Sequence, residues 1–209
     1  MTSSMSAVAH RSARHLVLLV LCVFATIAPA SAQVTITFWS QEMGKNFPHA
    51  FFTLRGTVEA TGAPVDISYG FTAKAITPAI LLGTVPGRID LTTEKYIARS
   101  NAHFSTVISD AQYASVLALV EQWGEGGDYS YNLNRRNCVH FVAEAMRRSG
   151  LAVEEPRALM KKPRSFTRSV AALNAGRVAV IEQPAAAYLA TLLPLAPATA
   201  APTGVVLAR

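Results

Sequence analysis

The sequence runs Asn134-Arg-Arg-Asn-Cys-Val-His-Phe-Val-Ala-Glu-Ala-Met-Arg-Arg-Ser-Gly150 at the point where a helical pattern meets a cysteine. Asn137 is a favoured N-cap residue, because its side-chain oxygen can accept a free N–H of the first helical turn. Apolar residues recur at helical spacing after Cys138, and Gly150 is suited to follow the end of a helix. The pattern therefore predicts a helix that begins at Cys138 and carries the thiol on its apolar face.

A cysteine in this position is a candidate nucleophile. The helix dipole and the free N–H groups of the first turn favour the thiolate, which is the reactive form. Arg135 and Arg136, just upstream, would favour it as well. The alternative is that Cys138 is a buried small apolar residue, which is a common state of free cysteine.

The first 32 residues are predicted to be a secretory signal. Arg11 and Arg14 give a positive start, residues 16–27 give an apolar core, and Ala30-Ser31-Ala32 is a small-residue cleavage site. The apolar run is too short for a typical membrane-spanning helix, although an uncleaved anchor is the alternative. We therefore expect an exported protein, periplasmic or secreted, with no stable membrane span after cleavage.

Removal of this signal leaves Cys138 as the only cysteine, so no intramolecular disulfide is possible. An odd cysteine in an exported protein indicates a reactive thiol or pairing between chains. The net charge falls from +6 to +4, because two of the 19 basic residues lie in the signal. No aromatic residues are interleaved with the basic cluster at 161–168, which argues against a nucleic-acid partner. No cofactor and no metal is expected.

Residues 33–175 are predicted to form one α+β domain, with an antiparallel sheet packed against helices. The runs 47–55 and 65–73 are rich in β-formers and flank a Gly/Pro turn, which predicts a hairpin. With the turn centred on Thr61-Gly62, Leu54 lies opposite Tyr69 and Phe52 opposite Phe71. Ser109 or Asp110 is expected to cap a helix over the next apolar repeat. Residues 76–88 are expected to be a loop, and 176–209 a loosely ordered, Ala/Pro-rich tail.

A cysteine nucleophile needs a base within hydrogen-bond reach, usually a histidine. Three histidines lie outside the predicted signal. His140 is two residues after Cys138, hence about 200° around the helix, and cannot serve the thiol. His49 and His103 lie in predicted strands and are both candidates. His49 is preferred, because it falls near the open end of the hairpin, on the face opposite the aromatic layer.

The segment Asn137-Cys-Val-His-Phe-Val142 resembles the Asn-Cys-Glu-His-Phe-Val signature of lecithin:retinol acyltransferase-like proteins. These belong to the circularly permuted branch of the NlpC-type, papain-like cysteine enzymes, in which a histidine strand precedes the cysteine helix. Pro48-His-Ala-Phe-Phe52 resembles that strand. The chain departs from the signature at Val139, and the family's second histidine has no counterpart; its place falls near Thr72.

The resemblance implies a permuted papain-like fold and a cysteine hydrolase or transferase acting on amide or ester bonds. Cys138 would be the nucleophile, His49 the base, and Thr72 would stand where the family has its second histidine. For an exported protein the family's cell-wall amidases make a peptidoglycan peptide the first substrate to consider, and an acyl group of a lipid the second. The alternative function is a non-catalytic envelope binding or scaffold domain with a buried Cys138.

Overall fold

A computed structural model describes residues 33–42 and 47–195 of the chain, so the predicted signal and its cleavage site lie outside the described residues. The elements run in the order β1 (Val34–Gln41), β2 (His49–Thr57), β3 (Pro64–Ala73), α2 (Ala79–Leu82), β4 (Thr84–Asp90), α3 (Glu94–Ile97), β5 (Asn101–Ile108), α4 (Asp110–Trp123), β6 (Ser130–Asn132), α5 (Cys138–Arg148), α6 (Pro163–Leu173), β7 (Ala179–Pro184) and α7 (Ala185–Leu189).

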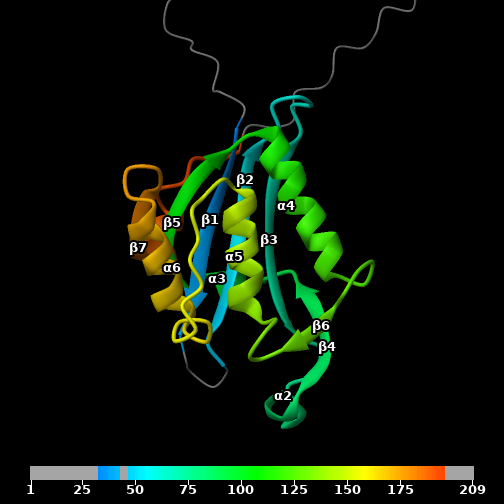
Figure 1. Cartoon of the computed structure of the whole chain (residues 1–209). Coiled ribbons are helices and arrows are strands. Elements are labelled where there is room, and N and C mark those ends of the chain that lie inside the picture. Colours follow the sequence, from blue (N-terminus) through cyan, green and yellow to red (C-terminus); the bar gives the residue numbers. More distant parts are fainter. Residues whose placement is uncertain (1–32, 43–46, 196–209) are drawn as a thin grey trace, which may run out of the picture. The chain divides into compact units, whose positions relative to one another are not determined.

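The described strands form one seven-stranded sheet in the order β6-β4-β3-β2-β1-β5-β7 (Figure 1). Every pair of neighbours is antiparallel. The prediction of an α+β fold with an antiparallel sheet and packed helices is therefore confirmed. In the described part of the chain, none of the helices has the length and apolar character needed to cross a membrane.

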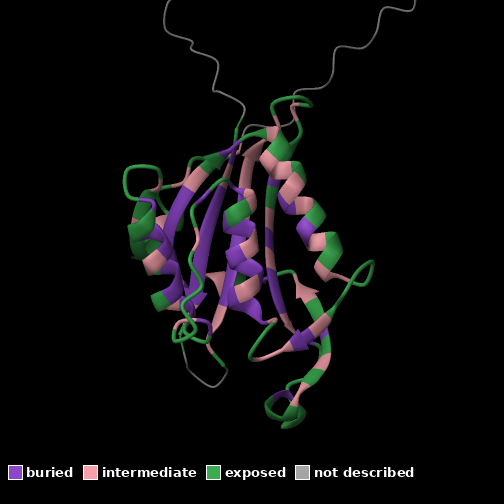
Figure 2. Cartoon of the chain, in the orientation of Figure 1, coloured by how far each residue is buried: buried purple, intermediate pink, exposed green. Residues whose placement is uncertain are grey.

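The sheet has an apolar cluster on each face. The larger cluster lies under α4, α5 and α6, and it contains Phe52, Phe104 and Phe141 among its buried side chains. The smaller cluster is built around Trp39 and Phe51, with side chains of α3 and α7 packed against it. Figure 2 shows the central strands and the inner side of α5 as the most buried parts. Because β1 and β2 are covered on both faces, they are apolar on both sides rather than alternating.

The hairpin of β2 and β3 forms as predicted, but its register is shifted by two residues. Phe52 pairs with Tyr69 and Leu54 with Ile67. β2 ends at Thr57 and β3 begins at Pro64. The centre of the connection therefore lies one residue before the predicted centre, Thr61-Gly62. A shift of two residues leaves the faces unchanged. The predicted aromatic layer therefore still lies in the larger cluster.

Helices α4 and α5 begin where the sequence predicts. Ser109 caps α4, and its side chain accepts from the Gln112 N–H, completing a capping box. Asn137 caps α5 and accepts from the N–H groups of Val139 and His140. Gly150, just after α5, has φ +81°, the left-handed conformation expected after a helix end.

Two sequence-based predictions about irregular regions are wrong. Residues 76–88 contain α2 and most of β4, because β4 pairs with β3 despite Pro86 and Gly87. The chain after residue 175 is not a loosely ordered tail as far as it is described. β7 pairs with β5, and Ala185 of α7 is fully buried against the smaller cluster. Backbone pairing needs no apolar pattern, so composition alone did not reveal this strand.

Candidate active site

Cys138 is the first residue of α5, and its side chain is only 7% exposed. The backbone N–H groups of Ala50, Val139 and Cys138 itself lie close enough to the sulfur to favour its thiolate, and the Val139 N–H also donates to the Asn137 side-chain oxygen at 2.8 Å. Two of these donors belong to the first turn of the helix, where N–H groups have no helical partner. The third belongs to β2, so the helix N-terminus meets the sheet at the residue that follows His49.

Burial sets the protonation state of this thiol. It raises the pKa of Cys138 to about 11, and the three backbone N–H groups only partly oppose it. The N–H groups of the helix N-terminus lower the pKa of the thiol as expected, but burial, the stated alternative for Cys138, outweighs them. The Arg136 guanidinium is directed to Trp123, 3.6 Å from the ring centroid, and Arg136 is not among the groups that shift the pKa of Cys138. Cys138 rests as a neutral thiol.

His49 begins β2 and lies against three neighbours. Its ring stacks on Phe51, with centroids 6.2 Å apart, and meets the edge of Tyr96 at 6.1 Å. On β3, Gly70 makes room for it, because a Cβ at Gly70 would stand 2.6 Å from the His49 Nε2. This Nε2 is buried and has no hydrogen-bond partner among the described residues. An unpartnered buried ring nitrogen costs stability and is a signal of function.

The electrostatics of His49 are governed by burial and one carboxylate. Burial lowers the pKa of the imidazole to about 4, and the charge of Asp90 opposes that shift. Asp90 ends β4 and pairs with Gly70, the residue beneath the ring. Its carboxylate is 3.3 Å from an Arg88 guanidinium nitrogen. At neutral pH His49 is therefore uncharged, with a negative group close enough to stabilise a positive ring.

The structure brings the backbone of His49 and Cys138 together, but no hydrogen bond joins their side chains in the described chain. His49 contacts Phe51 of the smaller cluster, whereas Cys138 belongs to the larger one. Ala50 links them, because its N–H is directed at the sulfur. Tyr96 is a second residue close to both side chains. Its ring packs against the His49 ring, and its pKa is raised mainly by burial and also by charge on Cys138.

Among the described residues, no hydrogen bond joins Thr72 to His49. Thr72 pairs with Arg88 across β3 and β4. The imidazole lies over Gly70 instead, one pleat closer to the turn. Any role of Thr72 in orienting His49 therefore stays a prediction, and Asp90 is the polar group whose charge reaches the ring.

His103 has both ring nitrogens occupied. Its Nε2 is 2.7 Å from the Ser40 Oγ, and its Nδ1 is 2.8 Å from a carboxylate oxygen of Glu182. A carboxylate only accepts, so Nδ1 donates to Glu182 and Nε2 accepts from Ser40 in the neutral ring. Arg168 holds the other oxygen of Glu182 at 2.7 Å. This is the connectivity of a serine–histidine–carboxylate triad, but Ser40 and His103 are both completely buried.

His140 serves the helix cap rather than the thiol. Its Nδ1 lies 3.3 Å from the Asn137 backbone nitrogen and 3.0 Å from the Asn137 side-chain oxygen. It completes the capping box of α5. The sequence-based exclusion of His140 as the base of Cys138 therefore agrees with its contacts.

Sequence reasoning missed Asp90 and Tyr96. Asp90 was not identified because its strand contains Pro86 and Gly87, which are typical of loops. Tyr96 lies in a one-turn helix, which leaves no periodic signal. In the described part of the chain, no group of three His, Cys, Asp or Glu side chains converges to hold a metal ion.

Comparison of the chain with protein-family models, with curated protein sequences and with solved structures finds no match.

Proposed function

We propose that the domain is a cysteine hydrolase or transferase acting on an amide or ester bond, with Cys138 as nucleophile and His49 as base. One observation carries the proposal. The backbone N–H of Ala50, the residue next to His49, lies close to the Cys138 sulfur, and His49 holds a buried ring nitrogen with no described partner. A nucleophile at the N-terminus of α5 and an unused base at the start of β2 are thus linked through the backbone of Ala50, although their side chains belong to opposite faces of the sheet.

The reaction begins from neutral partners. The Cys138 thiol attacks the carbonyl carbon, a C–S bond forms, and the thiol proton passes to the His49 Nε2. Asp90 stabilises the imidazolium that results. The backbone N–H of Cys138, which the Asn137 side chain does not cap, would donate to the developing oxyanion. Because the His49 ring lies on the face of the smaller cluster and the sulfur on the face of the larger one, the ring has to turn around the start of β2 to meet the thiol, and we expect this only in the substrate complex.

The second half of the reaction returns the site to its starting state. The C–N or C–O bond to the leaving group breaks as His49 gives its proton to the departing amine or alcohol. His49 then takes a proton from water, or from an acceptor alcohol or amine, as that molecule attacks the thioester. The C–S bond breaks as His49 passes this proton to the departing sulfur, which restores both the Cys138 thiol and the neutral ring.

His49 is preferred to His103 because of what each ring already contacts. Both nitrogens of His103 are hydrogen-bonded, to Ser40 and Glu182. His103 would have to break one of these buried contacts to accept a proton from the thiol. The His49 Nε2 has no such contact to lose among the described residues.

The substrate and location follow from the resemblance and the predicted signal. A strand with His49 precedes the helix of Cys138, the order of the circularly permuted papain-like branch, and supports that finer assignment of the fold. The protein would be exported to the periplasm or beyond, with a peptidoglycan peptide as substrate and a lipid acyl group as the second candidate. N-terminal sequencing of the exported protein should begin at Gln33.

The test is turnover of peptidoglycan and of a simple ester probe. Purified protein is incubated with cell-wall sacculi and, separately, with p-nitrophenyl acetate, and products are read by mass spectrometry and absorbance. Cys138→Ala should abolish both activities, and His49→Ala should lower them by about 10²-fold or more. His140→Gln is the matched control, because glutamine also suits the third position of a capping box.

The competing function is a non-catalytic binding or scaffold domain that buries Cys138. It would be favoured by folded protein that neither turns over a substrate nor forms a thioester detectable by mass. Equal loss of activity in His49→Ala and His140→Gln would argue that the histidine effect is only structural.

A further inference from the structure

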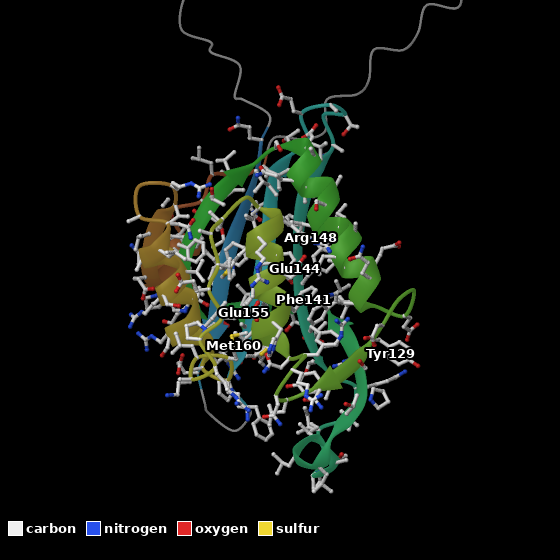
Figure 3. All side chains as sticks on the ribbon, viewed as in Figure 1. Tyr129, Phe141, Glu144, Arg148, Glu155 and Met160 are labelled. Atoms are coloured by element: carbon white, nitrogen blue, oxygen red, sulfur yellow. The ribbon has the colours of Figure 1, made fainter. Side chains whose placement is uncertain are left out.

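A hollow of about 680 Å³ lies beside the N-terminus of α5, and the proposed catalytic chemistry does not use it. One wall is the loop before Cys138, which includes Arg135. The other is the segment between α5 and α6, which includes Arg157, Lys161 and Lys162. Figure 3 shows Glu155 and Met160 of this segment beside the first half of α5. The volume lies in the range of small-molecule sites.

The two walls are fixed to each other by one side chain. The Asn137 Nδ2 donates to the carbonyl of Leu133 in the first wall and to that of Met160 in the second, both at 2.8 Å. Its oxygen accepts from the Val139 N–H at 2.8 Å. Asn137 is itself 2% exposed. The hollow is therefore held open by a buried hydrogen-bonded residue, and its basic side chains project from anchored backbone.

The charge of the hollow is strongly unbalanced. Four basic side chains line it, those of Arg135, Arg157, Lys161 and Lys162, against a single acid, Glu155. Glu155 is already ion-paired with a fifth cation, Arg147. It is therefore only partly available to neutralise the basic side chains that face the space.

The four basic side chains have no partner in the described chain. None of them forms an ion pair or a side-chain hydrogen bond with another described residue. Several arginines elsewhere on the domain are ion-paired. Arg55 pairs with Asp66, and Arg168 is paired with Glu182. Like charges gathered around one space repel each other, and a bound anion would relieve that repulsion.

His140 adds a donor to the same hollow. Its Nδ1 is engaged with Asn137, and its Nε2 has no recorded partner in the described residues. When Nδ1 accepts the Asn137 N–H, the ring proton is on Nε2, which then donates. Burial lowers the pKa of His140, while the nearby Glu155 raises it. A bound anion would have the effect of a second acidic neighbour.

From these contacts we infer that the hollow is a binding site for a phosphate-bearing ligand. A single carboxylate would leave most of the positive charge uncompensated, whereas a phosphate or diphosphate carries two or more negative charges. Arginine gives planar, paired donors to phosphate oxygens, and lysine gives a mobile point charge; the site offers two of each. The phosphate can belong to a free small molecule or to a lipid headgroup. The inference does not depend on the chemistry of Cys138.

The test is calorimetric titration of the full protein with inorganic pyrophosphate at low ionic strength. The variant Arg157→Ala/Lys161→Ala removes two cations of the hollow, and Lys95→Ala/Arg99→Ala removes an arginine and a lysine from the region of α3. All four side chains are exposed, so both variants should fold, which their thermal melts will check. The dissociation constant should rise about tenfold or more in the first variant, as expected for two lost charge-assisted contacts. It should change less than about threefold in the second.

Two results would overturn the inference: no heat of binding with pyrophosphate, or an equal loss of affinity in both double variants, which would indicate diffuse attraction to a basic protein. The variant Cys138→Ala should bind pyrophosphate as the wild type does, so failure of the proposed enzyme function and failure of this site are separable.

The source of the phosphate is distinguished by a flotation assay. Vesicles of phosphatidylcholine with phosphatidic acid are compared with vesicles of phosphatidylcholine alone. Retention on the acidic vesicles that pyrophosphate competes away, and that Arg157→Ala/Lys161→Ala loses, would assign the site to a lipid headgroup. Pyrophosphate binding without retention on vesicles would assign it to a free phosphate compound.

Discussion

Gly70 lies directly beneath the imidazole of His49, so closely that a Cβ there would stand 2.6 Å from Nε2 and 3.3 Å from Cε1. The position of His49 therefore depends on a residue of the neighbouring strand that contributes no side chain. Gly70 does not have a positive φ, so this requirement is steric and not one of backbone conformation.

Gly70→Ala should displace the His49 ring and destabilise the fold. Inserting a methyl group into a filled site costs about 1–3 kcal/mol, and the displaced ring should also lose its relation to Cys138. The measurement is the free energy of unfolding in urea, together with turnover of the ester probe. Gly83→Ala is the matched control, because a Cβ at Gly83 meets nothing within 4 Å. Similar losses in both variants would contradict the steric role.

The native Cys138 thiol should react slowly near neutral pH. Burial raises its pKa to about 11, which leaves about 100-fold less thiolate at pH 7–8 than a thiol of pKa 9 would have. The rate of alkylation by iodoacetamide should rise with pH to a midpoint near pH 11 in the native protein, and to a midpoint near pH 9 once urea unfolds it. A rapid reaction of the native thiol below pH 7 would instead indicate a thiolate–imidazolium pair.

The stability of the domain should fall on acidification, partly through His49. Its folded pKa of about 4 lies below the usual 6.5, so between these values the unfolded chain binds the extra proton. The contribution is complete above pH 6.5 and is lost as the pH falls towards 4. Between pH 7.5 and pH 5 it amounts to about 2 kcal/mol. Urea unfolding of wild type and His49→Gln at both pH values measures it.

Other groups titrate in the same window, so the comparison uses the difference between the two proteins. Burial also lowers the pKa values of His103 and His140, and both remain in His49→Gln. The variant should therefore lose less stability on acidification than the wild type by about 2 kcal/mol. Parallel pH profiles would show that His49 is accessible to protons in the folded state.

Glu182→Ala should destabilise the domain, although Glu182 lies on β7 at the edge of the sheet. It removes the acceptor of the buried His103 Nδ1, and an unpaired buried polar group costs about 1–3 kcal/mol. Glu182→Gln keeps an acceptor oxygen and should recover much of the loss. The thermal midpoint and the urea unfolding energy both report the effect.

The matched control is Glu125→Ala, which removes a carboxylate from an exposed pair with Lys74 at 3.9 Å. Such pairs contribute about 0–1 kcal/mol. If Glu182→Ala costs no more than Glu125→Ala, then the network around His103 contributes nothing measurable to stability.

The parts of the fold that follow a local rule could be predicted from the sequence. Ser109 and Asn137 cap α4 and α5 as expected, because capping involves only the residues of one turn. The aromatic face of the hairpin is also as predicted. The register of the hairpin differs from the prediction. It is set by the backbone hydrogen bonds of the turn after Thr57, which the pattern of the strands does not reveal.

The candidate site could be predicted only one residue at a time. Cys138 and His49 stood out as types of residue at suitable places, but the groups that set their pKa values come from other strands. Asp90 acts on His49 from β4, two strands away from β2. The sequence left a reactive thiol and a buried one both open for Cys138, because the degree of burial is a tertiary property that no local pattern shows.

The contact between His103 and Glu182 spans 79 residues and joins β5 to the last strand of the sheet. During synthesis or export the chain emerges in order, so everything through α6 is available before β7 arrives. Until then the outer edge of β5 is uncovered, and one nitrogen of an interior imidazole is unpaired. An open strand edge invites pairing between chains. The arrival of β7 closes that edge and satisfies the imidazole at once, so a chain stalled or clipped before residue 182 would remain prone to aggregation although all three helices over the main core had already been made.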